Sequence, residues 1–334
     1  MEPRVSILLP VRDAAATLPA CLASLRRQRE ARFDCVVADD GSRDGSLALA
    51  EKTAAEDPRF RVLAGPRRGL VPTLRRGLTA CRAPLVARID ADDWMHRDRL
   101  ALQCAELDAS PGLAAVGSHV RCFPRRDLGP GLRAYEAWLH SIDSPRRVFE
   151  ERFVECPVAH PTLLVRRDVL RRFDYRDAGW PEDYDLLLRL LDAGLRVGVV
   201  PHRLVGWRHT AGRHSRTSPT YDPLRFTACK AHFLARGFLS GATRYDLWGY
   251  GGTGRALVRA LRGEGREPAR IVELHPGRIG RTIQGAPVIA RHALGPPGRR
   301  PLLVSVAGAA ARTRIRRELA RLGYRECVDY VCAA

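Results

Sequence analysis

Three acidic residues follow an apolar run in the segment LVARIDADDWMHRDRL, residues 85–100. If residues 90–92 are extended, side chains two positions apart point the same way, so Asp90 and Asp92 would face one side and Asp93 the other. A pair of carboxylates suits a hard divalent cation such as Mg²⁺ or Mn²⁺, which prefers oxygen ligands and leaves positions for phosphate and water. The segment therefore contains a candidate metal site.

Two other interpretations of this segment are a calcium-binding loop and a solvated turn. An EF-hand calcium loop does not fit, because its sixth position would be Met95 instead of glycine and its twelfth Ala101 instead of glutamate. A solvated turn fits as well as a metal site does, because aspartate is a common turn residue. The segment alone does not decide between a turn and a metal site.

A second acidic pair, Asp39 and Asp40, follows the apolar run FDCVVA and precedes Gly41 and Ser42. Asp and Gly form turns readily, so a simple turn is again the plain interpretation. Two acidic strand ends in one sheet repel each other unless positive charge, or the donor groups of a base and a ribose, lies between them.

The elements that would hold these residues alternate between strand-like and helix-like segments. Such alternation implies crossover connections and a mainly parallel sheet, in which ligands bind beyond the carboxyl ends of the strands. Both acidic pairs stand at such ends. We expect strands at residues 5–11, 33–38, 61–63 and 85–89. One helix is expected to begin after Thr17, and two further helices are expected at 46–56 and 70–81.

The rest of the chain is less regular and then returns to an α/β pattern. We expect strands at 162–165 and 196–200, helices at 184–193 and 222–236, and polar loops at 125–131 and 207–219. Beyond a linker at 237–243, strands at 245–250, 269–274 and 301–306 alternate with helices at 255–262 and 312–322. The predicted domains are therefore residues 1–236 and 244–334.

Composition narrows the class of protein. Hydrophobic residues make up 45% of the 334 residues, which argues against global disorder. The net charge of +19 attracts anions, yet no helix-turn-helix, zinc-finger or RNP-like motif accompanies it, so we expect no specific nucleic acid partner. A basic surface that faces anionic acceptors or the lipids of a membrane fits better than nucleic acid, and a merely solvated basic surface fits better still.

The cysteines and the apolar runs bear on location. The nine cysteines are scattered, without a C-x-x-C pair, as is typical of reduced thiols in a cytoplasm. No N-terminal stretch has signal-peptide form, and the run LLVSVAGAAA is far shorter than the ~20 residues of a membrane helix. We expect a cytoplasmic protein that can also lie at the inner face of the cell membrane.

Five segments in order resemble the motifs of family 2 glycosyltransferases, which have the GT-A fold and use nucleotide-activated sugars. They are SILLPVRDAAATLPACLASLRRQ, VVADDGSRDGS, RRGLVPTLRRGL, LVARIDADD and WPEDYDLLLRLLDAG. The resemblance covers roughly residues 1 to 235. It implies an α/β GT-A domain with a mainly parallel mixed sheet.

The resemblance also implies roles for single residues. Asp90 and Asp92 would hold Mn²⁺ or Mg²⁺, with Asp92 the more direct ligand, and Asp183 in the pair Glu182-Asp183 would be the general base. The alternative for that pair is an acidic helix N-terminus favoured by the helix dipole. The residues that would line the nucleotide-sugar are Pro10, Val11, Asp39, Asp40, Asp90 and Ala91.

Some positions depart from the family pattern. Arg67, Pro72 and Arg75 stand where the family commonly has small residues and asparagine, and Arg67 or Arg68 could approach the diphosphate. A late histidine often completes the metal site; His209 and His214 both fit, and either could instead be a surface histidine. His160 matches a position near the acceptor, or is simply a packed histidine.

The C-terminal segment carries Gly249-Tyr-Gly251-Gly-Thr-Gly254 between a predicted strand and a helix, the context of a dinucleotide-binding loop. Glu273 ends the next strand, where a ribose-binding acid would lie. WGYGGTGRALVRAL and GRIGRTIQGAPVI resemble the Rossmann-like N-terminal domain of bacterial sugar acyltransferases. We expect a small accessory or ligand-sensing α/β domain.

The function that these features favour is an inverting, metal-dependent glycosyltransferase. It would move a sugar from a nucleotide-diphosphate donor to a hydroxyl of a glycan or lipid-linked acceptor in cell-surface polysaccharide biosynthesis. Two alternatives are a nucleotide-sugar-binding regulator without turnover and an NAD(P)-dependent oxidoreductase acting through the C-terminal domain.

Overall fold

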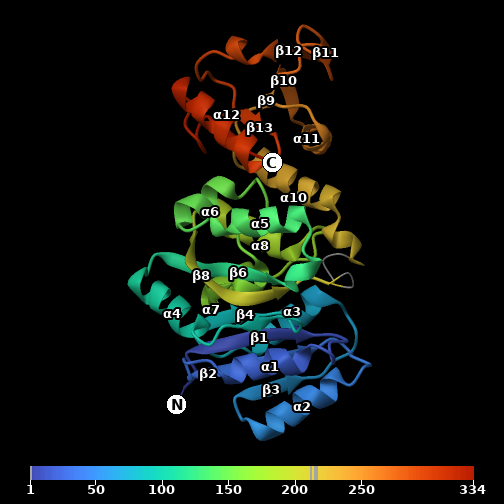
Figure 1. Ribbon diagram of the computed structural model, residues 1–334, viewed down its shortest axis with the longest axis vertical. Coiled ribbons are helices and arrows are strands. Elements are labelled where there is room, and N and C mark those ends of the chain that lie inside the picture. Colours follow the sequence, from blue (N-terminus) through green and yellow to red (C-terminus); the bar gives the residue numbers. More distant parts are fainter. Residues whose placement is uncertain (1, 211–212, 214–216) are drawn as a thin grey trace. The chain divides into compact units, whose positions relative to one another are not determined.

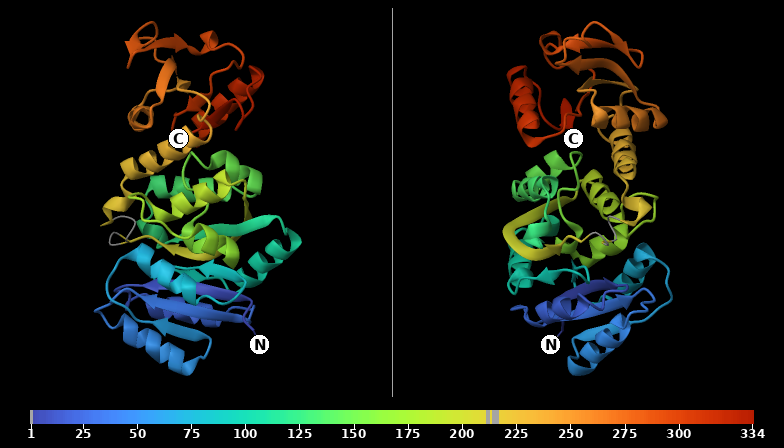
Figure 2. Two further views of the ribbon diagram at one scale, coloured as in Figure 1. Left: turned by 180° about the vertical axis from the view of Figure 1, so that it is seen from behind. Right: turned by 45° about the vertical axis from the view of Figure 1, so that its right-hand side comes forward.

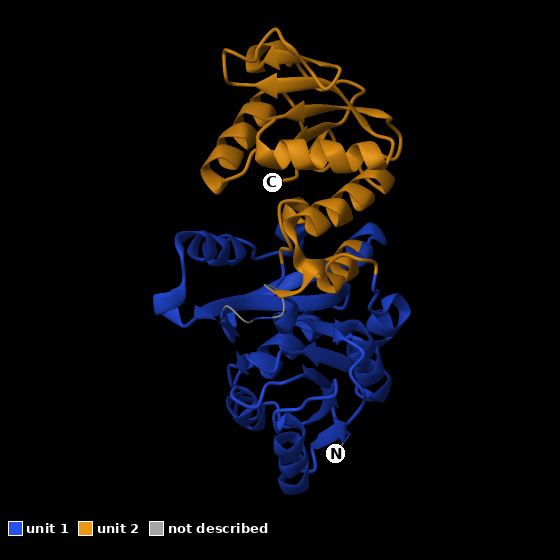
Figure 3. Cartoon of the chain, turned by 90° about the vertical axis from the view of Figure 1, so that its right-hand side faces the viewer, with its two compact units in different colours: residues 1–148, 158–177, 189–216 blue, residues 149–157, 178–188, 217–334 orange. Residues whose placement is uncertain are grey.

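A computed structural model describes residues 2–210, 213 and 217–334. The chain forms two compact units, which are coloured separately in Figure 3. Unit 1 comprises residues 1–148, 158–177 and 189–216, and unit 2 comprises residues 149–157, 178–188 and 217–334. Two segments from the middle of the sequence thus belong to the same compact unit as the C-terminal part. The domain boundaries at residues 236 and 244 stay a prediction.

Unit 1 is built on a mixed sheet (Figure 1). Within the described residues its eight strands lie in the order β3-β2-β1-β4-β7-β6-β8-β5. The neighbours of β1 and β2 and the pair β6–β8 are parallel, whereas β7 pairs antiparallel with β4 and β6, and β5 with β8. The bounds are β1 Val5–Val11, β2 Phe33–Asp39, β3 Phe60–Leu63, β4 Leu85–Arg88, β5 Trp94–Met95, β6 Leu113–Phe123, β7 Leu164–Arg166 and β8 Arg196–Arg208.

Helices cover both faces of the parallel part of this sheet. Ile7 and Leu9 of β1 share a core cluster with Leu25 of α1, while on the opposite face Leu8 lies against Gly77 of α3. Burial on both faces explains why β1 is an uninterrupted apolar run. The helices of unit 1 are α1 Leu18–Arg26, α2 Ser46–Glu56, α3 Leu70–Ala80, α4 Arg99–Ala109, α5 Pro130–His140, α6 Pro145–Glu151, which ends in unit 2, and α7 Arg167–Phe173, with short turns η1 Arg125–Asp127 and η2 His160–Thr162.

Unit 2 contains the second sheet, in the order β11-β12-β10-β9-β13-β14 (Figures 1 and 2). Its strand pairs are parallel, except for the antiparallel pair β11–β12. Strand β9 comes first in the sequence of this sheet and lies in its middle, as the first strand does in doubly wound folds. Its strands are β9 Arg244–Trp248, β10 Glu267–Glu273, β11 Thr282–Ile283, β12 Ala286–Ala290, β13 Leu302–Val304 and β14 Tyr330–Cys332.

Helices α11 and α12 of unit 2 pack against this sheet, and α10 packs against α11. Ile315 and Leu319 of α12 share a core cluster with Trp248, Val272 and Val304. The similarity of this part to an acyltransferase domain stays a prediction. The helices are α8 Glu182–Asp192, which begins in unit 2, α10 Pro223–Arg236, α11 Gly252–Gly263 and α12 Ala309–Arg321, with turns η3 Pro219–Tyr221 and η4 Arg291–Ala293.

The α/β class and the mixed sheet are as predicted, but some elements were missed. Strand β8 does not end at residue 200; it continues to Arg208 through the exposed residues 201–203. There its register with β6 shifts at Ser118 and His119, so the polar residues mark a bulge and not the end of the strand. The expected loop 125–131 also contains η1 and the first residues of α5.

Two further properties concern thiols and membranes. All nine cysteines are free, in agreement with the scattered spacing. In the part of the chain that the structure describes, no helix is long and apolar enough to cross a bilayer.

The close approach of α3 to the sheet gives a test of the packing. A Cβ added at Gly77 would overlap the Leu8 side chain and lie 3.3 Å from the Ala38 Cβ. We expect Gly77→Ala to lower the free energy of unfolding by about 1–3 kcal/mol, as overpacking does. Gly131, in α5 of the same unit, has open space around it, so Gly131→Ala should be neutral or raise stability by up to about 1 kcal/mol. Denaturant unfolding of both variants measures the difference, and equal effects would contradict this packing.

Candidate functional site

The turn after β4 presents the first acidic cluster. Asp93 N donates to Asp90 O at 3.1 Å, which closes the turn, and β5 begins directly after it. The Trp94 indole occupies the space where a side chain on Gly206 of β8 would lie. The turn is thus held between β4 on one side and β8 on the other.

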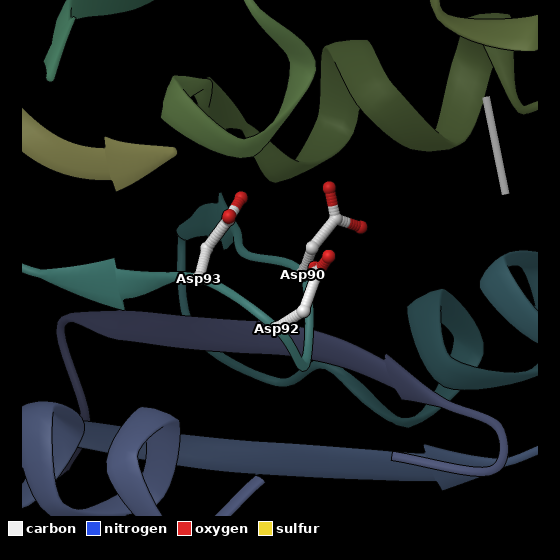
Figure 4. Close-up of side chains that lie close together, drawn as sticks. All are labelled: Asp90, Asp92 and Asp93. Carbon is white, nitrogen blue, oxygen red and sulfur yellow. The ribbon is translucent and has the colours of Figure 1, made fainter. Parts of the chain in front are cut away.

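Asp90, Asp92 and Asp93 each place one carboxylate oxygen within 4.8 Å of the others. Figure 4 shows all three side chains projecting to the same side of the turn. We expected Asp93 to face away, and this expectation is wrong. It assumed a strand-like alternation, whereas the hydrogen bond from residue 93 to residue 90 folds the backbone back and returns Asp93 to the side of Asp90.

Arginines neutralise part of this negative charge. Arg88 Nη2 donates to Asp90 Oδ1 at 2.6 Å, and Arg213 Nη2 lies 3.5 Å from Asp90 Oδ2. Although desolvation opposes ionisation, Arg88 and Arg213 lower the pKa of Asp90 to about 2. Asp90 is therefore the member of the cluster that stays ionised.

The other two carboxyl groups are less well compensated. Desolvation and the charge of Asp90 raise the pKa of Asp92, and desolvation raises the pKa of Asp93 well above its usual value. Asp93 Oδ1 accepts a hydrogen bond from Arg208 N at 2.7 Å, whereas its buried Oδ2 has no hydrogen-bond partner among the described residues. An orphaned oxygen beside two further carboxylates fits a hard divalent cation, which would remove their mutual repulsion.

Of the two late histidines, His209 lies within the described residues. His209 N donates to Phe123 O at 2.8 Å, and the His209 ring lies 4.6 Å from the Trp207 ring. His209 is not among the side chains that gather within 4.8 Å, so its role as a ligand stays a prediction. His214 lies outside the described residues.

His160 is close enough to this turn to affect Asp90 electrostatically. Its Nε2 lies 3.0 Å from the Tyr175 hydroxyl, and its ring is buried. Burial and the charge of Arg88 lower the pKa of His160 to about 3, so the ring is neutral at pH 7. These contacts describe a packed histidine, and contact with an acceptor stays a prediction.

The second acidic pair ends β2, beside the end of β1. Asp40 Oδ1 accepts from Arg68 N at 2.7 Å, Gly69 N at 3.0 Å and Thr73 Oγ1 at 3.0 Å, so this carboxylate fixes the start of α3. Asp39 Oδ2 accepts from the amides of residues 41 and 42, but its buried Oδ1 has no partner within the described part of the chain. Asp39 therefore has one buried acceptor oxygen without a partner among the described residues, whereas Oδ1 of Asp40 already accepts three hydrogen bonds.

The remaining predicted nucleotide contacts lie around these strand ends. Pro10 and Val11 are the last residues of β1 and pair with Ala38 and Asp39 of β2. Ala91 is buried inside the acidic turn, and Arg67 and Arg68 are exposed in the loop before α3. Their contact with a nucleotide stays a prediction.

In unit 2, Glu182 and Asp183 form the first turn of α8. The buried Glu182 carboxylate accepts the Tyr221 hydroxyl, with distances of 2.9 and 2.7 Å to its two oxygens. Asp183 is half-buried, and its Oδ1 accepts a hydrogen bond from Tyr184 N at 2.8 Å. The helix begins two residues before the predicted Tyr184, and the helix dipole favours both acids there.

The glycine-rich loop of unit 2 connects β9 and α11, as predicted. Gly249 has a φ of +91°, and a side chain on Gly254 would overlap Gly249 O and Ser305 Oγ. Glu273 Oε1 accepts from Tyr250 N at 2.9 Å and pairs with Arg278 at 3.1 Å, so this acid braces the loop. A ligand contact of Gly249, Gly251, Gly254 or Glu273 stays a prediction.

Sequence reasoning missed the buried arginines behind the acidic turn. Arg88 is the last residue of β4 and interrupts the apolar run of residues 85–89. This position was the sequence signal that could have found it, because a buried arginine requires partners. Arg99 is fully buried and donates to Arg88 O at 2.9 Å and Leu163 O at 3.2 Å. Burial lowers the pKa of Arg99 to about 9.

Several known proteins are similar to this chain. The glycosyltransferase EpsJ of Bacillus subtilis (strain 168) is 32% identical over 261 residues, which are 74% of this chain and 74% of EpsJ. The O-antigen biosynthesis protein RfbC of Myxococcus xanthus is 30% identical over 218 residues, 61% of this chain and 16% of RfbC. The chain spans less than two thirds of the length of some relatives that it matches, including RfbC.

Among solved structures, S. aureus TarS 1-349 in complex with UDP-GlcNAc aligns with a TM-score of 0.57 and 15% identity. The alignment covers 78% of this chain and 72% of that one, and at this identity it shows the fold alone, which is GT-A. A family model described as Glycosyl transferase family 2 matches residues 6–173. The chain therefore belongs to glycosyl transferase family 2.

Proposed function

We propose that this protein is an inverting, metal-dependent glycosyltransferase. It moves a sugar from a nucleotide-diphosphate donor to a hydroxyl of a glycan or lipid-linked acceptor in cell-surface polysaccharide biosynthesis. The observation that carries the proposal is the cluster of Asp90, Asp92 and Asp93 beyond the end of β4. Membership of the family supports it, as do the role of RfbC in O-antigen biosynthesis and the UDP-GlcNAc bound to TarS.

The acidic cluster would hold Mn²⁺ or Mg²⁺. A bound divalent cation neutralises charge on a departing nucleoside diphosphate. Asp90 supplies an ionised carboxylate at any pH above its depressed pKa, and a bound cation would offset the desolvation and repulsion that raise the pKa values of Asp92 and Asp93. Around the diphosphate, Arg67 and Arg68 would supply positive charge, and Pro10, Val11, Asp39, Asp40 and Ala91 would line the nucleotide.

Asp183 would act as the general base. Its carboxylate takes the proton of the acceptor hydroxyl while the acceptor oxygen forms a bond to the anomeric carbon. The bond from that carbon to the donor phosphate oxygen breaks, and its electron pair leaves with the nucleoside diphosphate. Attack from the side opposite the leaving group inverts the anomeric centre.

The location follows from the substrates. Nucleotide sugars are cytoplasmic metabolites and lipid-linked acceptors lie in membranes, so we propose action at the inner face of the cell membrane. The net charge of +19 would favour contact with anionic lipids there.

The regulator and the oxidoreductase remain the alternatives. A thermal-shift screen of nucleotide sugars, with and without Mn²⁺, detects a donor because binding to the native state raises apparent stability. Donor binding without hydrolysis or transfer would favour the regulator. Binding of NAD(P)H by the full-length protein would favour the oxidoreductase.

The geometry of the acidic cluster predicts that Mn²⁺ binding requires Asp93 as much as Asp92. Asp92→Asn and Asp93→Asn should each weaken Mn²⁺ binding by at least about 100-fold, because each removes a charged ligand. Asp108→Asn, at an exposed acid paired with Arg4, is the matched control and should bind as the wild type does. Mn²⁺ titration followed by electron paramagnetic resonance measures this. Wild-type affinity in Asp93→Asn would restrict Asp93 to shaping the turn.

The base assignment predicts a selective loss of turnover. Asp183→Asn should lower kcat by about 10²–10⁴-fold with donor affinity unchanged, because the amide cannot accept the proton. Asp192→Asn, at the exposed end of the same helix, should keep wild-type kcat. Steady-state transfer assays and donor titrations measure both quantities, and full turnover by Asp183→Asn would remove this residue as the base.

A further inference from the structure

The first turn of α8 is held in place through the residues on either side of Asp183. Glu182 accepts the Tyr221 hydroxyl, and the Tyr184 hydroxyl donates to Arg152 O at 2.6 Å. In the same turn, Asp185 Oδ1 accepts a hydrogen bond from Trp180 Nε1 at 3.0 Å. All of these residues belong to unit 2. The position of Asp183 therefore depends on its neighbours Glu182 and Tyr184, and on how firmly the groups that bind these two side chains are fixed.

The two tyrosines are fixed by packing. The Phe226 ring of α10 lies 5.8 Å from the Tyr184 ring and 6.4 Å from the Tyr221 ring. Tyr184 is completely buried, and burial raises the pKa of its hydroxyl well above 10, so the hydroxyl stays a donor to Arg152 O. Tyr184 thus links α8 to the backbone of the segment 149–157.

Segment 149–157 is held in turn by charged residues of the C-terminal α/β fold, which comprises β9–β14 and the helices around them. Glu151 is only 1% exposed, and its carboxylate lies 2.8 Å from Arg316 Nη1 and 3.8 Å from Arg312 Nε, both on α12. Arg316 also pairs with Glu326 at 2.7 Å, which fixes the guanidinium itself. A buried carboxylate between two arginines defines one position for the backbone that carries it.

A second contact acts on the same segment. Lys230 Nζ of α10 donates to Val154 O at 3.1 Å and to Ala333 O at 2.8 Å. The C-terminal fold therefore holds segment 149–157 at a side chain, Glu151, and at a backbone carbonyl three residues later. Arg152 O, the acceptor of Tyr184, lies between these two points.

We propose that Glu151, Arg312 and Arg316 are positioning residues for glycosyl transfer. They fix segment 149–157, whose Arg152 carbonyl fixes Tyr184 and with it the adjacent Asp183. This inference rests on the proposed role of Asp183 as the base. It gives the C-terminal α/β fold a part in the reaction that needs no ligand in the glycine-rich loop.

The expected effect is on turnover and not on donor affinity. A general base that is displaced by about 1 Å can lose on the order of 100-fold in rate, because proton transfer needs close alignment. The donor contacts proposed above are all in unit 1, so their affinity should not change. A general loss of stability would instead reduce the active fraction and leave the kcat of the folded enzyme unaltered.

The test uses full-length Glu151→Gln and Tyr184→Phe, with the active concentration taken from donor titration. Both variants should lower kcat at least 10-fold while the Kd for the donor and the KM for the donor stay within 2-fold of wild type. Glu318→Gln is the matched control, because Glu318 is on α12 but pairs with the exposed Arg291. It should keep wild-type kcat.

A double variant separates positioning from damage. In Glu151→Gln/Asp183→Asn the residual rate should equal that of Asp183→Asn alone, because Glu151 acts through a base that is already absent. The inference would be overturned if the two substitutions lowered the rate of the double variant by the product of their separate effects. It would also be overturned if folded Glu151→Gln kept the wild-type kcat, or if only its KM rose. If Glu151→Gln does not fold, as circular dichroism would show, Tyr184→Phe decides by the same criteria, since it removes one oxygen.

The two proposals fail in different ways. Full turnover by Asp183→Asn contradicts the proposed base and removes the basis of the inference with it. If Asp183→Asn is inactive while Glu151→Gln and Tyr184→Phe are fully active, the result contradicts only the positioning role.

Discussion

The repulsion among three carboxylates in one tight turn is the constraint on which the site depends. Asp90, Asp92 and Asp93 cannot all be ionised within 4.8 Å of one another without compensating charge. The chain supplies part of that charge through Arg88 and Arg213, which is enough to keep Asp90 ionised but leaves Asp92 and Asp93 with raised pKa values. The incomplete compensation is what makes the turn a candidate cation site and not an ordinary solvated turn.

Arginines buried behind this turn follow from the same constraint. Arg88 extends from an apolar strand, and Arg99 uses its fully buried guanidinium to bind the backbone of β4 and of the segment before β7. Such groups cost free energy to bury unless they are paired, and the carbonyl oxygens of Arg88, Ile89 and Leu163 accept hydrogen bonds from them. The same arginines therefore contribute both to the packing of the sheet and to the electrostatics of the site.

The sequence predicted the parts of this arrangement that depend on local pattern. The parallel strands β1, β2 and β4 are buried on both faces, and the apolar runs that this burial requires are visible by inspection. The side on which Asp93 lies was not predictable, because it depends on a turn hydrogen bond. The full length of β8 was hidden by a polar bulge opposite Ser118, and the partners of Glu151 and Tyr184 are separated from them in sequence by many residues. Pattern reasoning finds strands and motifs, whereas long-range pairing requires the fold.

The most direct test of the central claim is a crystal structure of the full chain with Mn²⁺ and a nucleoside diphosphate, in which anomalous scattering locates the metal. The account predicts one strong peak about 2.0–2.3 Å from carboxylate oxygens of the Asp90, Asp92 and Asp93 cluster and in contact with the diphosphate. A bound nucleotide with the peak elsewhere, or with no peak and the cluster paired only with arginine, would contradict it.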